Sequence, residues 1–194
     1  MSEARKIAVF GGTFDPVHLG HVKMAGLAQK ALGLDEVRFV PCRISPHKTG
    51  QVAPAPGDDR LEMLRRATAD LAWAVVDDCE LHSDETSFSY ATAESMRVRF
   101  PGARLFWIVG GDQWDALPQW RHPQRLAACV EFIVFGRGGV PQPRAGFVMH
   151  VLAGSHPAAA RAIREAIAQG DTSHPWLAPP VAEWIARRRL YQGI

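Results

Sequence analysis

Residues 6–21 read KIAVFGGTFDPVHLGH, an apolar run followed by two glycines and then two histidines. Residues 6–10 predict a buried strand, because their apolar side chains continue without the alternation of a half-exposed strand. Residues 18–32 predict an amphipathic helix, because their apolar positions recur at helical spacing. A strand that passes through glycines directly into a helix indicates an α/β fold.

The rest of the chain continues this alternation of apolar runs and helical periodicity. We expect one domain over residues 1–194, with a C-terminal helical portion from about residue 155. Strands separated by helices predict a Rossmann-like, doubly wound parallel sheet with helices on both faces. Further strands are expected at 36–40, 73–76, 104–109, 131–135 and 147–152, and helices at 58–71 (with Asp58 or Asp59 as N-cap), 89–100, 157–168 and 180–189.

Composition excludes several classes of function. Of the 194 residues 47% are hydrophobic, and the net charge of +2 provides no basic field of the kind that a nucleic-acid-binding protein carries. The run 187–189 of three arginines is expected on a solvated helix face. Three widely spaced cysteines, without a CxxC pair, indicate a reducing compartment. We find no signal-peptide pattern and no membrane-spanning run, so the expectation is a cytoplasmic protein without a membrane partner, for which a homo-oligomer is compatible.

Distinctive polar segments follow the ends of the predicted strands, at 11–21, 41–48, 110–112 and 136–139. In a parallel sheet the ligand crevice lies beyond the carboxyl ends of the strands. The sequence therefore predicts a binding site at this edge.

The segment 11–21 has the chemistry of a phosphate site. Glycines after a strand let a ligand approach the backbone, and a helix start offers free N–H groups and a partial positive charge. His18 and His21, on either side of Gly20, can donate hydrogen bonds to phosphate oxygens. Metal ligation by the two histidines ranks lower, because a zinc site needs a third or fourth ligand and none is clear nearby.

This segment resembles the signature of the HxGH nucleotidyltransferase superfamily, and its longer form GGTFDPVHLGH is similar to that of bacterial nicotinate-nucleotide adenylyltransferases. The similarity covers nearly the whole chain. The motifs that carry it further are Pro46-His47-Lys48, Asp59-Arg60 with Met63, Ser89-Tyr90, Gly110-x-Asp112, Trp120 and Arg137.

The resemblance implies transfer of AMP from ATP to nicotinate mononucleotide, with Mg²⁺ carried by ATP and no metal site in the protein. It implies four catalytic residues: His18, His21, Lys48 and Arg137. It implies ATP contacts from Gly11, Gly12, Thr13, Phe14, His18, Gly20, His21, Gly110, Asp112, Arg137 and Arg164. It implies mononucleotide contacts from Asp15, His47, Lys48, Ser89, Tyr90, Ala91, Thr92 and Trp120. Arg121 is a separate hypothesis: it follows Trp120 at a position where the family often has an aromatic residue, and its cation would favour a pyridine carboxylate.

Several of these residues also have a purely structural interpretation. Lys48 could equally be a solvated loop lysine, and Asp112 could be the N-cap of the following helix. Ser87 or Ser89 is equally a helix cap, and Arg121 a surface arginine. Trp120 stands in a polar stretch suited to stacking on a base, whereas the other five tryptophans fit packing positions better.

Two further functions stay open. One is an adenylyltransferase for nicotinamide mononucleotide or phosphopantetheine, and the other is a nucleotide-binding module without turnover. One departure from the pattern keeps the binding module open: Ala159 and Ala160 stand where the family has two serines of a phosphate-binding segment that ends in Ile163-Arg164. Ser155 or His156 could supply a replacement donor if the loop folds inward. Gly138 also departs from the family, which usually has proline there.

Overall fold

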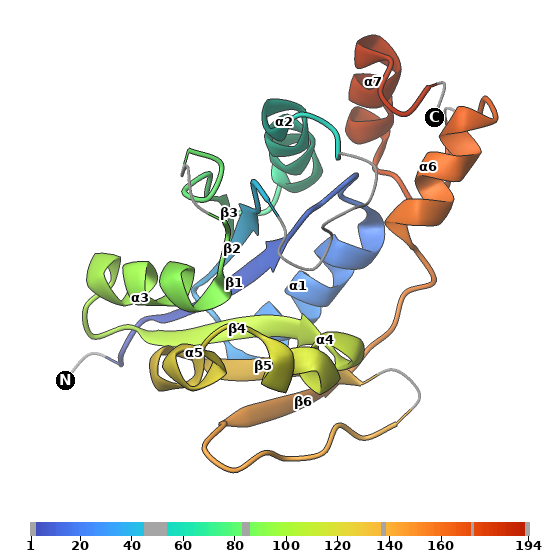
Figure 1. The fold of residues 1–194 in the computed structure, drawn as a ribbon. Coiled ribbons are helices and arrows are strands. Elements are labelled where there is room, and N and C mark those ends of the chain that lie inside the picture. Colours follow the sequence, from blue (N-terminus) through green and yellow to red (C-terminus); the bar gives the residue numbers. More distant parts are fainter. Residues whose placement is uncertain (1–2, 45–53, 83–85, 137–138, 172, 193–194) are drawn as a thin grey trace.

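The computed structural model describes residues 3–44, 54–82, 86–136, 139–171 and 173–192. Within them, strands and helices alternate as the sequence predicts, except that the last two strands follow one another without a helix between them (Figure 1). The strands are β1 (Lys6–Gly12), β2 (Glu36–Pro41), β3 (Ala74–Val76), β4 (Arg104–Gly110), β5 (Glu131–Gly136) and β6 (Met149–Ala153). The helices are α1 (Leu19–Leu32), α2 (Gly57–Thr68), α3 (Ser89–Arg99), α4 (Gly111–Ala116), the 3₁₀ turn η1 (Leu117–Gln119), α5 (Pro123–Cys129), α6 (Ala160–Ala168) and α7 (Pro179–Arg188).

The six strands form one parallel sheet in the order β3-β2-β1-β4-β5-β6. Strand β1 lies in the middle, with Val9 opposite Arg38 of β2 and Trp107 of β4. The order reverses between β1 and β4, and such a switch point is where open α/β sheets bind ligands. The predicted fold class, a doubly wound parallel sheet, is therefore confirmed.

Side chains of β1 alternate between two apolar cores, one on each face of the sheet. Ala8 and Phe10 pack with α1, α2, α6 and α7, whereas Ile7 and Val9 pack with α3, α4 and α5. Figure 1 shows the two groups of helices on opposite sides of the sheet. Burial on both faces explains why the strands read as continuous apolar runs.

The structure corrects several predicted boundaries. Gly11 and Gly12 complete β1 rather than following it, and α6 begins at residue 160 rather than 157. Helix α2 has Pro56 as N-cap, and Asp58 and Asp59 lie in its first turn. The sequence reading missed η1 and α5, and it considered α4 only as the helix that Asp112 could cap, because each is a short helix without a full amphipathic period.

The arginine run near the C-terminus is more than a solvated face. Arg188 forms an ion pair with the buried carboxylate of Asp59, with 2.9 Å between Nε and Oδ1. The indole of Trp184 donates to the same oxygen at 3.2 Å. These contacts fasten α7 to α2. No helix in the described ranges combines the length and the apolarity that a membrane crossing needs. All three cysteines are free thiols.

Candidate active site

The loop from β1 to α1 brings two histidines together at a helix start. His18 is the N-cap of α1 and His21 is its third residue. Their rings are stacked, with centroids 3.7 Å apart and planes 21° apart. The backbone N–H of His18 donates to Nδ1 of His21 at 3.2 Å. In the neutral ring of His21 the proton is then on Nε2, which can donate to a ligand.

Phe14, before the two histidines, and Gly20, between them, shape the loop. Phe14 has a positive φ of 48°, and its buried ring lies edge-on to His21 at 5.0 Å. Phe14 also packs against Phe10 and Phe39, so its ring supports the histidine from the core. Gly20 is closely surrounded, because an added Cβ would lie 3.0 Å from Nδ1 of His18 and 3.2 Å from Cβ of His156, which is tighter than most contacts of a real Cβ.

His156 therefore lies against the histidine motif. The loop that carries His156 folds inward, toward the start of α1. Nδ1 of His156 accepts the N–H of Ala158 at 3.1 Å, which leaves Nε2 of the neutral ring as a donor. Its neighbour in sequence, Ser155, is exposed. Trp176 closes the same side, since its carbonyl accepts the N–H of Leu19 at 2.9 Å. The segment between β6 and α7 thus covers the start of α1.

Arg164, on α6, reaches the same loop. Its Nη1 donates to the carbonyl of Asp15 at 2.7 Å and lies 3.7 Å from the carboxylate of that residue. About a third of the arginine side chain stays exposed. Helix α6 has Ala159 as N-cap and Ala160 as its first residue. The two alanines thus stand at a helix start, where their methyl groups offer no hydroxyl donor.

A second group of candidate residues lies where α3 begins and where η1 ends, near the carboxyl ends of β3 and β4. The ring of Tyr90 lies 5.0 Å from that of His122, and the guanidinium of Arg121 lies 4.8 Å above the ring of Phe88. Trp120 is half-buried and packs against the core under α3, α4 and α5. The N-cap of α3 is Phe88, so neither Ser87 nor Ser89 caps this helix.

Ala91 and Thr92, in the first turn of α3, already form hydrogen bonds within the protein. The hydroxyl of Thr92 donates to the buried carboxylate of Glu80 at 2.5 Å. Burial raises the pKa of Glu80, and the hydrogen bonds from Thr92 and Ser87 partly oppose this shift. The amides of Ala91 and Thr92 donate to the carbonyl of Phe88. In the first turn of α3 the amides of Ser89 and Tyr90 remain as candidate donors to a carboxylate.

The remaining predicted residues fall into three sets. Gly11 and Gly12 end β1, with Thr13 following; Gly110 is the N-cap of α4, and Asp112 is exposed in the first turn of that helix. Asp112 is therefore not the N-cap. His47, Lys48 and Arg137 lie outside the described residues, as does Gly138.

Sequence reasoning gave no role to Arg60, which holds the loop between β1 and α1 by hydrogen bonds from its buried guanidinium. It is 2% exposed, and its guanidinium donates to the carbonyls of Thr13 and Cys42 at 2.8 Å and of Ala55 at 2.9 Å. Arg60 thereby joins the ends of β1 and β2 to the start of α2. It also lines a hollow of 340 Å³, together with residues 54–58, Arg43, Leu81 and His82. The available signal was the Asp59-Arg60 pair within an amphipathic helix.

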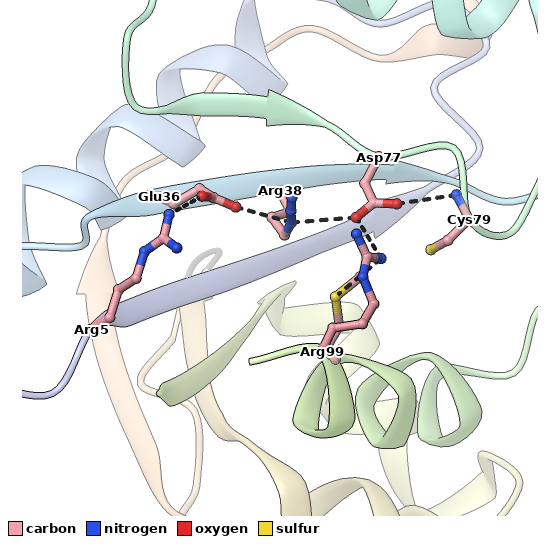
Figure 2. A network of polar contacts seen from close by, with 7 residues as sticks. Arg5, Glu36, Arg38, Asp77, Cys79 and Arg99 are labelled. Atoms are coloured by element: carbon pink, nitrogen blue, oxygen red, sulfur yellow. Dashed lines mark hydrogen bonds and ion pairs between the residues drawn. The ribbon is translucent and has the colours of Figure 1, made fainter. Parts of the chain in front are cut away.

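A polar cluster between β2, β3 and α3 was also missed. Figure 2 shows Arg38 between two carboxylates, with Nε 2.9 Å from Glu36 and 3.3 Å from Asp77. Arg99 reaches Asp77 at 2.9 Å. Burial, together with the charge of Asp77, raises the pKa of the nearby Cys79 thiol to about 12. This cluster fixes α3 on the sheet and so supports the residues at its N-terminus.

Comparison with known proteins assigns the family. Residues 9–174 match the family described as cytidylyltransferase-like. The chain belongs to this family. Its sequence is 35% identical over 190 residues to a probable nicotinate-nucleotide adenylyltransferase of Shouchella clausii, covering 96% of this chain and 97% of the relative. It is 32% identical over 188 residues to the protein of that name from Lactiplantibacillus plantarum, covering 97% and 89%. The resemblance expected from the motifs is confirmed.

The fold of this cytidylyltransferase-like chain also matches solved structures. Nicotinic acid mononucleotide adenylyltransferase of Plasmodium falciparum, solved in complex with NaAD, superposes with a TM-score of 0.79 at 16% identity. The match covers 96% of this chain and 97% of that one. A second structure of that protein, complexed with APC, gives a TM-score of 0.76. At this identity the match shows a shared fold.

Proposed function

We propose that this chain is a nicotinate-nucleotide adenylyltransferase, which transfers AMP from ATP to nicotinate mononucleotide and produces deamido-NAD and pyrophosphate. The observation that carries this proposal is the stacked His18–His21 pair at the start of α1, which places two imidazoles where a helix N-terminus favours phosphate. Family membership and the names of the relatives support it further.

The reaction needs no nucleophile from the protein. An oxygen of the mononucleotide phosphate attacks the α-phosphorus of ATP, and the bond from that phosphorus to the bridging oxygen breaks. The electron pair of that bond leaves with pyrophosphate. Because the attacking phosphate is already ionised at neutral pH, catalysis consists of positioning and of stabilising charge on the phosphates. His18 and His21 would donate to the α- and β-phosphates, with assistance from Lys48, Arg137 and Arg164.

The C-terminal segment supplies substitutes for the hydroxyls that Ala159 and Ala160 lack. His156 lies against the histidine motif and has an Nε2–H available in its neutral ring. We assign it to the phosphates of ATP, together with Arg164. Gly110 and Asp112 would meet the adenosine ribose.

The mononucleotide would bind near the start of α3. Amides at Ser89 and Tyr90 would face the pyridine carboxylate, Trp120 would stack on the ring, and Arg121 would add a positive charge. His47 and Lys48 would contact the mononucleotide phosphate.

We propose that Mg²⁺ arrives bound to the triphosphate of ATP. Within the described ranges no three His, Cys, Asp or Glu side chains gather as a metal site would need. Mg²⁺ commonly binds through substrate phosphates with few protein ligands, and there it neutralises phosphate charge. We place the enzyme in the cytoplasm, which agrees with its three free thiols.

The test is to incubate the protein with ATP, Mg²⁺ and either nicotinate or nicotinamide mononucleotide, and to identify the product by mass. We expect deamido-NAD and pyrophosphate in equal amounts. Preferential formation of NAD, or adenylylation of phosphopantetheine alone, would assign a different substrate. Binding of ATP without formation of any product would identify a nucleotide-binding module.

A further inference from the structure

Asp15, in the loop before His18, is held by three distant parts of the chain. Its Oδ1 accepts the N–H of Ala55 at 3.1 Å and the hydroxyl of Tyr191 at 2.8 Å. Its carbonyl accepts Nη1 of Arg164 at 2.7 Å, and its Oδ2 lies 3.7 Å from the same nitrogen. Asp15 is 7% exposed, so these contacts are shielded from water.

Tyr191 reaches Asp15 through an uncommon backbone conformation. The chain turns after α7 with positive φ at two non-glycine residues, Arg189 at 52° and Tyr191 at 62°. This region is unfavourable for L-residues, and such conformations persist where surrounding contacts impose them. The ring of Tyr191 is 6% exposed in the core with α6 and α7, whereas its hydroxyl leaves that core to meet the carboxylate. Packing alone would be served equally well by phenylalanine.

We infer that Tyr191 is a positioning residue for ATP binding, which acts by fixing the Asp15 carboxylate and thereby the guanidinium of Arg164. This inference rests on the proposed function, in which Arg164 contacts the ATP phosphates. With the Tyr191 hydroxyl present, Oδ1 of Asp15 has two donors and Oδ2 stays at a distance from Arg164.

Loss of the hydroxyl changes this balance. The carboxylate can then turn toward Arg164 and form a close charge-assisted pair with it. That pair takes N–H donors of the guanidinium away from the triphosphate. The expected defect is weaker ATP binding, with little change in mononucleotide binding.

The test compares Tyr191→Phe with the matched variant Trp184→Phe. Each removes one hydrogen bond from the C-terminal region to a buried carboxylate, but Trp184 donates to Asp59 and not to the loop. We expect Tyr191→Phe to raise the KM for ATP about three- to tenfold, the loss expected for one hydrogen bond. Its KM for nicotinate mononucleotide and its kcat should stay within about twofold of the wild type. Trp184→Phe should leave both KM values and kcat unchanged, even if it lowers the Tm as much as Tyr191→Phe does.

A double-mutant cycle with Asp15→Ala tests the route. If Tyr191 acts through Asp15, adding Tyr191→Phe to Asp15→Ala raises the KM for ATP no further. Additive effects, or equal changes in both variants of the first comparison, would overturn the inference. Should Asp15→Ala fail to fold, the comparison of Tyr191→Phe with Trp184→Phe decides alone.

The same proteins separate this inference from the proposed function. If the wild type forms no dinucleotide, the proposed function fails, and calorimetric dissociation constants for Mg·ATP decide about Tyr191. A higher dissociation constant for Mg·ATP in Tyr191→Phe, but not in Trp184→Phe, supports the inference. Equal dissociation constants in the two variants overturn it.

Discussion

Nδ1 of His21 accepts the backbone N–H of His18, so one histidine caps the helix while its other nitrogen stays a donor. The stacked rings, 3.7 Å apart, keep both imidazoles at the start of α1. Under the proposed function the two nitrogens of His21 would have separate tasks, so substitutions that imitate one nitrogen at a time can separate folding from catalysis.

We expect His21→Asn to fold normally and to lose turnover on the order of 10²-fold or more, because its amide oxygen can accept the His18 N–H but no donor replaces Nε2. His21→Gln should keep more activity, since its amide reaches the position of Nε2. His18→Ala should lose turnover comparably. Steady-state rates and thermal unfolding, measured together, check this. Near-normal turnover in both His21→Asn and His18→Ala would remove these residues from the mechanism.

Arg164→Ala should raise the KM for ATP about tenfold, and well beyond the change for the mononucleotide, because a charge-assisted contact to phosphate is lost. Arg161→Ala is the matched control on the same helix. Arg161 is exposed and paired with Glu165 at 2.8 Å, so its removal should change neither constant. If both KM values move equally in Arg164→Ala, the arginine is not an ATP contact.

Arg121→Ala should lower the preference for nicotinate over nicotinamide mononucleotide about fivefold, the size of a partly exposed charge interaction. The control is Arg125→Ala, which removes the same charge. Arg125 lies 4.5 Å above the ring of Tyr90 and already forms a pair with Glu94 at 2.7 Å. Comparison of kcat/KM for the two substrates checks this. An unchanged ratio in Arg121→Ala leaves the preference to the backbone donors of α3.

Glu80 and Glu131 should shift stability with pH in opposite directions. Burial raises the pKa of Glu80 from 4.5, so its protonated form stabilises the fold below that pH, and this contribution is lost as pH rises through the raised value. A hydrogen bond from Arg104 lowers the pKa of Glu131, so its contribution is present above 4.5 and lost as pH falls through the lowered value.

Denaturant unfolding of the wild type, Glu80→Gln and Glu131→Gln between pH 3 and 8 measures both effects. The stability advantage of wild type over Glu80→Gln should shrink as pH rises above about 4.5. The stability advantage of wild type over Glu131→Gln should grow as pH rises toward about 4.5. Parallel curves for the two variants would contradict the assigned environments.

Much of the fold could be predicted because its signals are local. The apolar run at Ile7–Phe10 and the periodicity of α1 lie within one segment, and repetition of that pattern specifies a parallel sheet. Short helices escaped prediction because packing decides them: α4 owes its place to Trp114, which is fully buried under β5. Intrinsic propensity over six residues carries little weight against such contacts.

The candidate site divides in the same way. His18, Gly20 and His21 belong to one continuous motif, so sequence alone indicates their chemistry. Arg60 and Tyr191 act through contacts to residues 47 and 176 positions away, and no local pattern predicts such partners. A buried arginine and a tyrosine among apolar residues read in sequence as ordinary helix and core positions.

The bond between Asp15 and Tyr191 also bears on the order of folding. It joins residues 176 positions apart, whereas contacts within a strand–helix unit are local and form sooner. The sheet and α1 can therefore assemble before the hydroxyl of Tyr191 reaches Asp15 in the loop between β1 and α1. That contact forms when α7 docks. In native-state hydrogen exchange we expect the amide of Ala55 to exchange in the same opening event as α7, ahead of the central strands β1 and β4. If Tyr191 positions the ATP site as we infer, substrate affinity is a late product of folding in this protein, acquired after most of the architecture is in place.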